Sequence, residues 1–249
     1  MDNVDFFVCA HNDFGCTLTN PVYKLICGPN DDVPKPDGID LIRIEPEISN
    51  IGFSEWQKWY WVWKHYDIKD YIGLMHYHRI LKLGTEPNDV PDMETLFNNC
   101  SLVIAKPFNT GYVYGQYEQC HNIEDLNTVI EIILKDYEEY ADACNAVMSN
   151  GWLFICNLMI MSAADFRDMC EFVFGVLFKF CEKRGIDRTS DDSFYEYIDR
   201  DISKYKKLHK KDDTTFREQA RVCSFLAERL VSIWIAKNRP VMKFTEIYE

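Results

Sequence analysis

Hydrophobic and polar positions alternate in blocks along the first half of the chain. Four short apolar runs, each bounded by polar or turn-forming residues, cover residues 4–10, 39–44, 70–81 and 100–106. Runs of this length predict buried strands. Ser54 can cap a helix over residues 55–64, between the second run and the third. Strands that alternate with helices predict an α/β fold with a mostly parallel central sheet.

The second half of the chain has a mainly helical pattern. Its periodicity predicts one more strand over residues 152–161 and helices over residues 124–147, 163–183 and 215–237. We expect this helical C-terminal part to pack on the sheet. No internal repeat or low-complexity linker interrupts the pattern, so the simplest prediction is one domain over residues 1–249.

Charge and hydropathy narrow the functional classes. The net charge of −13 argues against nucleic acid as a partner, because phosphate contacts need clustered Lys and Arg. The one basic run, Lys204–Lys211, is short and is interpreted as a solvated helix end or loop. No apolar stretch reaches the roughly 18 residues that a transmembrane helix needs, and the acidic N-terminus does not resemble a signal peptide.

The ten cysteines point to a reducing compartment. None of them forms a C-x-x-C pair, which argues against a zinc ribbon or a thioredoxin-type site. Several lie inside apolar runs, as Cys9 and Cys156 do, and this is typical of reduced cysteines in a protein core. We therefore expect a cytoplasmic protein, with peripheral attachment to a membrane left open.

The end of the third apolar run carries the most informative side chains. His76 and His78 would point to the same face if the strand continued through them, because side chains alternate along a strand, and Arg79 follows. Ligands of open α/β sheets bind at the carboxyl ends of strands, where these groups could bind an anionic diphosphate. Two other interpretations stay open: partly buried histidines beside a surface arginine, or a transition-metal site.

A second group of polar residues precedes the predicted long helix. If residues 116–126 are helical, His121 and Asp125 are one turn apart and could act together in acid–base chemistry. Alternatively, Asp125 is only an acidic residue favoured at a helix N-terminus. Near the end of the chain, Glu228 is a possible base, although its spacing from Arg221 favours a structural ion pair.

Two further motifs are weaker. The aromatic run Trp59–Trp63, with Trp61 at its centre, predicts a helix that is mostly buried or that lines a sugar or base site on one side. The one Asp-x-Asp in the chain, Asp199–Asp201, lies in a polar stretch that is expected to be helical, and it is interpreted as a solvated face rather than a metal site.

Several of these segments together resemble a family of bacterial capsular and exopolysaccharide biosynthesis proteins, long catalogued as a domain of unknown function and regarded as glycosyltransferases. Residues 55–65 resemble the family's aromatic helix, and residues 70–81 its Asp-Tyr-Ile-Gly-Leu-x-His-Tyr-Arg-Arg strand. A Gln-Tyr-x3-His-x3-Asp-Leu signature is matched by Gln116, Tyr117, His121, Asp125 and Leu126. Asn157 and the block 225–230, which contains Arg229, fit two later motifs, and the first strand with His11 is similar to the family's opening strand.

The resemblance implies a fold of the GT-A kind and transfer of a hexose such as galactose from a UDP-sugar to a glycan or lipid-linked saccharide. It implies a nucleotide-sugar-binding half over residues 1–110 and an acceptor half over residues 111–249. On this fold we expect the donor diphosphate to lie against His76, His78 and Arg79, with His11 near the nucleotide. His121, Asp125 and Glu228 are the candidate catalytic residues near the acceptor, any one of which could be the base. Trp61, Gln116, Tyr117, Asn157 and Arg229 would contact the acceptor or support the structure.

The chain departs from the family pattern at several positions. His78 stands in place of Arg, Asn12 in place of Lys and Ser224 in place of Gly. The Asp-x-Asp that holds a metal in many nucleotide-sugar transferases is replaced here by His76-Tyr77-His78, so no metal ligand is assigned, and a need for Mn²⁺ or Mg²⁺ stays open. Two alternatives also stay open: a metal-dependent hydrolase built on His76, His78, His121 and Asp125, and a glycan-binding protein without catalysis.

Overall fold

The computed structural model describes residues 3–205, 213–238 and 240–248. A seven-stranded sheet forms its centre, in the strand order β10-β6-β9-β4-β1-β2-β3. Neighbouring strands are parallel throughout, except that β9 is antiparallel to both of its neighbours. The predicted α/β class with a mostly parallel sheet is therefore confirmed. The strands are β1 (Val4–Cys9), β2 (Tyr23–Cys27), β3 (Asp40–Arg43), β4 (Tyr71–His76), β6 (Leu102–Ala105), β9 (Met159–Ser162) and β10 (Met242–Thr245).

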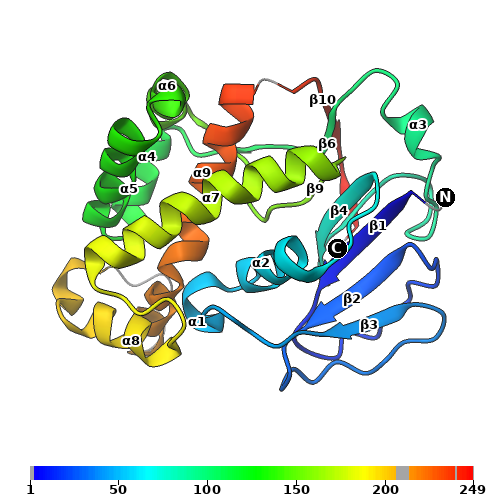
Figure 1. Cartoon of the computed structure of the whole chain (residues 1–249), viewed down its shortest axis with the longest axis horizontal. Helices are drawn as coiled ribbons and strands as arrows, with labels where there is room; N and C mark the ends of the chain where they lie inside the picture. The colour runs from blue at the N-terminus through cyan, green and yellow to red at the C-terminus, as the bar shows by residue number, and fades with distance from the viewer. Residues whose placement is uncertain (1–2, 206–212, 239, 249) are drawn as a thin grey trace.

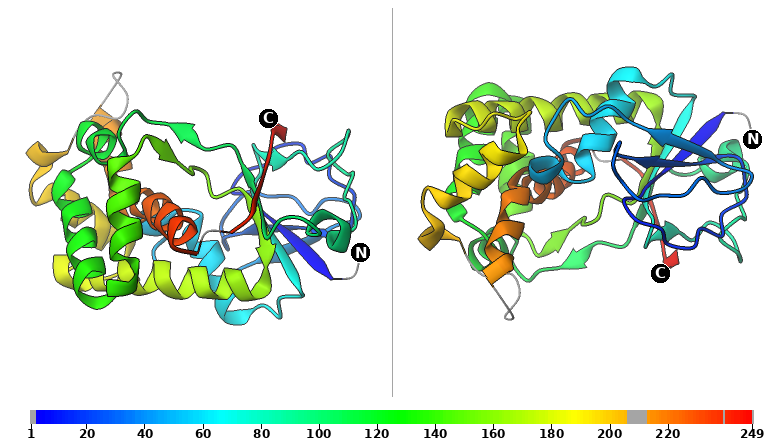
Figure 2. Two further views of the ribbon diagram at one scale, coloured as in Figure 1. Left: turned by 90° about the horizontal axis from the view of Figure 1, so that it is seen from above. Right: turned by 90° about the horizontal axis from the view of Figure 1, so that it is seen from below.

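The helices gather beside one end of this sheet and over one of its faces (Figure 1). The long helix α7 runs from the helical part to the strands, and the views from above and below agree on this (Figure 2). Strand β1 shows how the two faces are filled, since Phe7 packs into the core with the helices and Phe6 into a second core on the other face. The helices are α1 (Asn50–Phe53), α2 (Trp56–His65), α3 (Met93–Leu96), α4 (Val113–Cys120), α5 (Ile123–Asp136), α6 (Ala141–Ser149), α7 (Ala163–Arg184), α8 (Asp191–Asp199) and α9 (Val222–Asn238).

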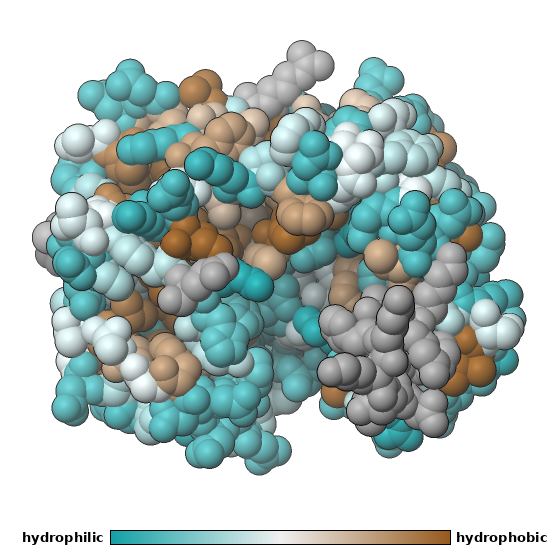
Figure 3. All heavy atoms as spheres, turned by 180° about the vertical axis from the view of Figure 1, so that it is seen from behind, coloured by the Kyte–Doolittle hydropathy of each residue, from teal (hydrophilic) through white to brown (hydrophobic). Residues whose placement is uncertain are grey.

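Short elements complete the described chain. A ribbon of two antiparallel strands pairs β7 (Phe108–Asn109) with β8 (Trp152–Leu153), and another pairs β5 (Ile80–Leu81) with β11 (Ile247–Tyr248). Three 3-10 helices cover Glu138–Tyr140, Ile202–Lys204 and Asp213–Arg221. The face seen in Figure 3 is mostly hydrophilic, with groups of hydrophobic side chains between the polar ones.

The aromatic run packs into the core, as one of the two interpretations predicted. Trp56 and Trp59 of α2 are buried, and Trp63 stacks on Phe174 of α7 with 5.6 Å between the ring centroids. Trp61 is half-buried at the edge of the same core, where its ring lies 5.5 Å from that of His65. Stacked and edge-to-face aromatic pairs stabilise such a core beyond the area that they bury.

The start of this helix differs from the prediction. Ser49 caps the short helix α1 through its hydroxyl, which accepts a hydrogen bond from the backbone N–H of Gly52 at 2.9 Å. Ser54 ends α1 with a φ of 52°, and α2 begins only after Glu55. Ser54 is therefore a break between two helices and not an N-cap. This break leaves Glu55 at the start of α2, where it faces the carboxyl edge of the sheet.

The predicted strand over residues 70–81 ends at His76. Residues 77–78 form a tight turn, in which the N–H of Arg79 donates to the carbonyl of His76 at 2.7 Å. The expectation that His76 and His78 share a strand face is thus wrong, because His78 lies in the turn. Gly73 within β4 is explained by close packing, since a Cβ at this position would lie 2.5 Å from the ring of Phe6.

Three later elements are interrupted where the pattern predicted continuity. The helix over residues 124–147 breaks at Tyr137 into α5 and α6, and the helix over 215–237 begins as a 3-10 helix before α9. The strand over 152–161 divides into β8 and β9, because Cys156 and Asn157 have φ values of 65° and 50°. Strand β2 was not predicted at all. The helix over 163–183 is confirmed as α7.

Two sequence expectations concern the surface and the cysteines. Most of the basic run Lys204–Lys211 lies outside the described residues. All ten cysteines are free thiols, with Cys181 and Cys223 buried side by side at 3.7 Å between their sulfurs. Among the helices of the described part, none is both long and apolar enough to cross a bilayer.

Candidate active site

A cavity of about 680 Å³ opens at the carboxyl ends of β1, β2 and β4. In open α/β sheets, this edge is where ligands bind. Its walls come from the loops that follow these strands, from the junction of α1 and α2, and from the end of the 3-10 helix before α9. The lining residues are Cys9, His11, Asn12, Asn30, Asp31, Asp32, Asn50, Ile51, Ser54, Glu55, Lys58, His76, Tyr77, His78, Arg79 and Arg221.

The four residues predicted to bind the donor all line this cavity. The ring centroids of His11 and His76 are 6.3 Å apart, and those of His76 and His78 are 5.8 Å apart. Tyr77 joins the group, because its hydroxyl lies 3.0 Å from Nε2 of His11. Arg79 donates from Nη1 to the sulfur of Cys156 at 3.1 Å. The tight turn after β4 therefore brings these groups together, although a continuous strand would not.

Two histidines of the cavity, His11 and His76, favour the neutral form. Burial, followed by the positive charges of His11, His78, Arg79 and Lys58, lowers the pKa of His76 to about 4. Burial and the charge of Lys58 also lower the pKa of His11. His76 therefore offers a neutral imidazole near pH 7, which can donate or accept a hydrogen bond. The full positive charges of the cavity come instead from Lys58, Arg79 and Arg221.

Lys58 is a cavity residue that the sequence pattern did not predict. It projects from α2, its side chain is 4% exposed, and its Nζ lies 3.6 Å from Oδ2 of Asp31. The signal was present in the sequence, because a lysine stands between Trp56 and Trp59 in a helix that is otherwise mostly apolar. A charge at such a position is rarely buried without a partner or a ligand.

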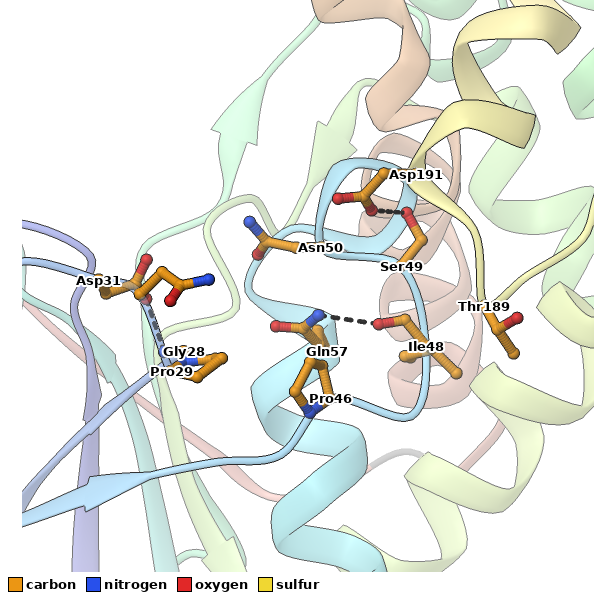
Figure 4. A pocket seen from close by; sticks show the side chains of 11 residues that line it. Gly28, Pro29, Asp31, Pro46, Ile48, Ser49, Asn50, Gln57, Thr189 and Asp191 are labelled. Atoms are coloured by element: carbon orange, nitrogen blue, oxygen red, sulfur yellow. Dashed lines mark hydrogen bonds between the residues drawn. The ribbon is translucent and has the colours of Figure 1, made fainter.

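A second, smaller pocket of about 320 Å³ adjoins the cavity and shares Asn30, Asp31 and Asn50 with it. Figure 4 shows side chains from the β2 end on one side and from α1 and α2 on the other. Two lining groups are already paired: Asp31 accepts from the N–H of Gly28 at 2.6 Å, and Gln57 donates to the carbonyl of Ile48 at 2.8 Å. The pocket is polar, and it extends the main cavity toward the start of α8.

The loop between β8 and β9 forms a polar support behind the cavity. Asn157 donates to Glu55 Oε1 at 3.1 Å, and the N–H of Cys156 donates to Glu228 Oε1 at 3.1 Å. Both loop residues have positive φ values, which are uncommon for residues other than Gly. Residues in such strained conformations cluster at functional sites in many proteins. Glu55 itself lines the cavity, whereas Glu228 is not one of the lining residues.

Glu228 continues into a buried network. It pairs with Arg229 at 3.1 Å, and Arg229, which is only 2% exposed, also donates to Gln116. Burial raises the pKa of Glu228, and the Arg229 guanidinium opposes this shift. Tyr117 is fully buried with its ring 5.0 Å from the Arg229 guanidinium. Gln116, Tyr117, Asn157 and Arg229 thus lie together behind the cavity, while Trp61 lies in the helical core.

His121 and Asp125 do not line the cavity. His121 ends α4 and Asn122 caps α5, so the two residues belong to different helices rather than to one continuous helix. His121 Nδ1 lies 2.9 Å from Gln219 Oε1, and its ring stacks on Phe225. Asp125 has no exposed surface and accepts from the hydroxyl of Tyr197. Both residues are therefore buried, and each forms hydrogen bonds with a different partner.

These surroundings also shift the pKa values of both groups. Burial lowers the pKa of His121 to about 4, although the hydrogen bond to Gln219 opposes the shift. Burial raises the pKa of Asp125 to about 6, against the hydrogen bond from Tyr197 and the charge of Arg184. Both shifts follow from burial in a packed interior. Neither group is open to a ligand in the main cavity.

Metal ligands are not gathered in the part of the chain that the structure describes. There, no group of three or more His, Cys, Asp or Glu side chains is placed to hold a metal ion. In particular, His76 and His78 line the cavity, while His121 and Asp125 lie in the buried cluster. The four-residue metal site of the hydrolase hypothesis is therefore not formed. Asp199 ends α8, and Asp201 pairs with Lys204 at 3.2 Å outside the cavity.

The fold is shared with a known protein. The apo structure of the bifunctional glycosyltransferase WbbM superposes with a TM-score of 0.72 and 20% sequence identity, over 98% of this chain. This chain spans 45% of that protein's length. No curated protein sequence matches the chain. A family model does match, over residues 6–197, and it is described as a domain of unknown function, DUF4422. Because this match covers most of the sequence, the chain belongs to the DUF4422 family.

Proposed function

We propose that this chain is a glycosyltransferase that moves a sugar from a nucleotide-diphospho-sugar to a glycan acceptor. The observation that carries the proposal is the cavity at the carboxyl edge of the sheet, where Lys58, Arg79 and Arg221 line the wall together with histidines, amides and three carboxylates. An anionic diphosphate suits this lining, because charged donors bind phosphate oxygens strongly. The fold that the chain shares with a bifunctional glycosyltransferase supports the same function.

The proposed reaction needs few groups. An acceptor hydroxyl attacks the anomeric carbon, the bond from that carbon to the diphosphate oxygen breaks, and the nucleoside diphosphate leaves with the electron pair. The hydroxyl proton passes to a carboxylate. Glu55 is the proposed base, since it lines the cavity and is oriented by Asn157 at 3.1 Å. A base must come within hydrogen-bond reach of the acceptor, and Glu228, His121 and Asp125 lie farther from the lining.

Finer features of the proposal come from the family resemblance. The donor would be a UDP-sugar, the transferred unit galactose or a related hexose, and the acceptor a glycan or lipid-linked saccharide in polysaccharide synthesis. The fold would be of the GT-A kind, and the protein would work in the cytoplasm, also at a membrane surface. His11, His76, His78 and Arg79 would hold the donor, and Mn²⁺ or Mg²⁺ could assist them.

A donor screen tests the proposal directly. The protein is incubated with UDP-, GDP-, dTDP- and ADP-sugars, with Mn²⁺ or with chelator, and release of the nucleoside diphosphate is measured with and without oligosaccharide acceptors. We expect one donor class to be cleaved faster when an acceptor is present. Binding of glycans with no cleavage of any sugar nucleotide would contradict the proposal and would favour a glycan-binding protein.

A further inference from the structure

The cavity contains one cation whose surroundings differ from those of the others. Lys58 has a side chain that is 4% exposed, whereas Arg221 lies in an exposed position and Arg79 in a partly exposed one. Charges in a buried site are screened less by water and salt than exposed charges are. An anion that enters the cavity therefore interacts most strongly with the Lys58 ammonium.

The Lys58 ammonium has N–H donors that are not used in short hydrogen bonds. Its carboxylate partner, Asp31, lies at 3.6 Å, which is longer than a charge-assisted hydrogen bond of about 2.8 Å. Asp31 uses the same oxygen, Oδ2, to accept from the N–H of Gly28 at 2.6 Å. Among the described residues, the Lys58 ammonium donates no hydrogen bond within 3.5 Å. A buried ammonium with three donors and one loose partner is costly unless a ligand completes its coordination.

The positive charge of Lys58 affects the pKa values of groups at the centre of the cavity. It lowers the pKa of His11 and of His76, and it acts against the burial that raises the pKa of Cys9 to about 12. These three residues follow or end β1 and β4, at the middle of the sheet edge. Lys58 lies in the first turn of α2 and lines the cavity together with these strand-end residues.

Apart from the histidines, the cavity is lined by equal numbers of basic and acidic side chains. Lys58, Arg79 and Arg221 stand against Asp31, Asp32 and Glu55. Asp32 is exposed, and Glu55 is occupied by the side-chain amide of Asn157. Arg221 donates to the hydroxyl of Ser54 at 3.2 Å. The carboxylate that competes for Lys58 is thus Asp31, and the competition sets how firmly an anion is held.

We propose that Lys58 forms a phosphate subsite that binds the pyrophosphoryl group of the donor in place of a divalent metal, and that Asp31 holds the ammonium until the ligand takes it over. This inference rests on the proposed function for its ligand, a nucleoside diphosphate. When the phosphate oxygens accept from Lys58 directly, the long contact to Asp31 is replaced by shorter charge-assisted hydrogen bonds. The subsite also stabilises the diphosphate as negative charge develops on it during cleavage.

Titration calorimetry in EDTA tests the subsite with four probes: inorganic pyrophosphate, UDP, UMP and uridine. For the native protein we expect UDP to bind at least tenfold more tightly than UMP. For Lys58→Met we expect the affinity for UDP and for pyrophosphate to fall by about tenfold to a hundredfold, with uridine unchanged. The matched control is Lys64→Met, which removes an exposed lysine that stacks on Trp63 in the same helix, and which should bind all probes as the native protein does.

Asp31→Asn separates a subsite from a merely structural ion pair. The amide oxygen can still accept from Gly28, but the competing negative charge is gone, so the ratio of UDP affinity to uridine affinity should rise about threefold or more. A structural pair predicts instead that both variants lose affinity together with thermal stability. Circular dichroism and the melting midpoint report on folding for each variant.

The outcomes distinguish the subsite from the proposed function. A folded Lys58→Met variant that binds UDP as tightly as the native protein overturns the subsite and leaves the function intact. Binding of pyrophosphate that depends on Lys58, without binding of any nucleoside diphosphate, supports the subsite and overturns the function. A native protein that binds UDP only with Mn²⁺ present contradicts the substitution of lysine for metal.

Discussion

Two regions of the molecule hold the same kinds of side chain in opposite settings. At the sheet edge, His76 lies beside the cationic groups Lys58 and Arg79 and the carboxylate Glu55, and all of them line a cavity. Between α4, α5 and α8, His121 and Asp125 lie in a buried cluster with Tyr197 and Gln219. Burial lowers the pKa of both histidines to about 4. The pKa shift alone therefore does not separate a binding site from a structural cluster.

The difference lies in how far the polar groups are already satisfied. The imidazole of His121 has Gln219, and the carboxylate of Asp125 has Tyr197 and Tyr205, so little capacity is left for a ligand. Lys58 in the cavity has one loose partner at 3.6 Å. Perturbed groups at functional sites are those that also face open space. We infer that the cavity carries the chemistry, while the cluster stabilises the packing of α4, α5 and α8.

Replacement of Glu55 should reduce activity more than any other substitution in the cavity. Glu55→Gln should lower kcat about 100-fold to 10,000-fold, because a general base contributes this much to the rate, and should leave the KM for the donor within about threefold. Steady-state kinetics with the donor that the screen identifies would measure this. Glu139→Gln, an exposed carboxylate in a 3-10 helix, is the control. A kcat for Glu55→Gln that stays within threefold of the native value would contradict the assignment.

Two arginines provide a second contrast. Arg79 lines the cavity, whereas Arg184 pairs with Asp125 at 3.7 Å in the buried cluster. Arg79→Gln should weaken donor binding about tenfold to a hundredfold through the loss of charge-assisted hydrogen bonds. Arg184→Gln should lower the melting temperature and leave donor affinity within twofold. Equal losses of donor affinity in the two variants would remove the distinction between the regions.

The smallest effect on activity, and a clear one on stability, is expected at His121. The pKa of His121 in the folded state is about 4, below the usual 6.5. Between these two pH values the imidazole is protonated in the unfolded chain and neutral in the folded chain. Stability from this group is therefore full above pH 6.5 and is lost as pH falls toward 4, by up to about 3 kcal/mol. His121→Gln should flatten this part of the profile, measured by urea unfolding from pH 4.5 to 7.5, with kcat within twofold. If the free energy of unfolding of His121→Gln depends on pH as steeply as that of the native protein, this role of His121 is contradicted.

The sequence predicted the architecture better than the boundaries. Apolar runs identified β1, β4 and β6, because buried parallel strands are continuous in hydrophobicity. The run that identified β3 lies on an edge strand whose residues are exposed or half-buried. Strand β2 escaped, since Lys24 interrupts its run; in the fold this lysine pairs with Asp40 at 2.8 Å. The turn after His76 has no glycine or proline at its centre, only Tyr77 and His78, so the usual turn signals were missing.

The candidate site was predictable in part. His11, His76, His78 and Arg79 could be placed because they follow strands, and strand ends share one edge of a parallel sheet. Lys58 and Glu55 come from a helix whose facing is set by tertiary packing, and the break at Ser54 that exposes Glu55 rests on a positive φ. The spacing of His121 and Asp125 suggested one helix face, but two caps intervene at His121 and Asn122.

A thermal-shift screen of nucleotide-diphospho-sugars in EDTA shows whether the cavity at the sheet edge binds a nucleotide-sugar donor. A ligand that binds only the folded state raises the melting temperature as its concentration rises. We expect a concentration-dependent increase with one sugar nucleotide, which Lys64→Met retains and which is smaller in Arg79→Gln at the same ligand concentration. No increase with any sugar nucleotide, with or without Mn²⁺, would contradict it.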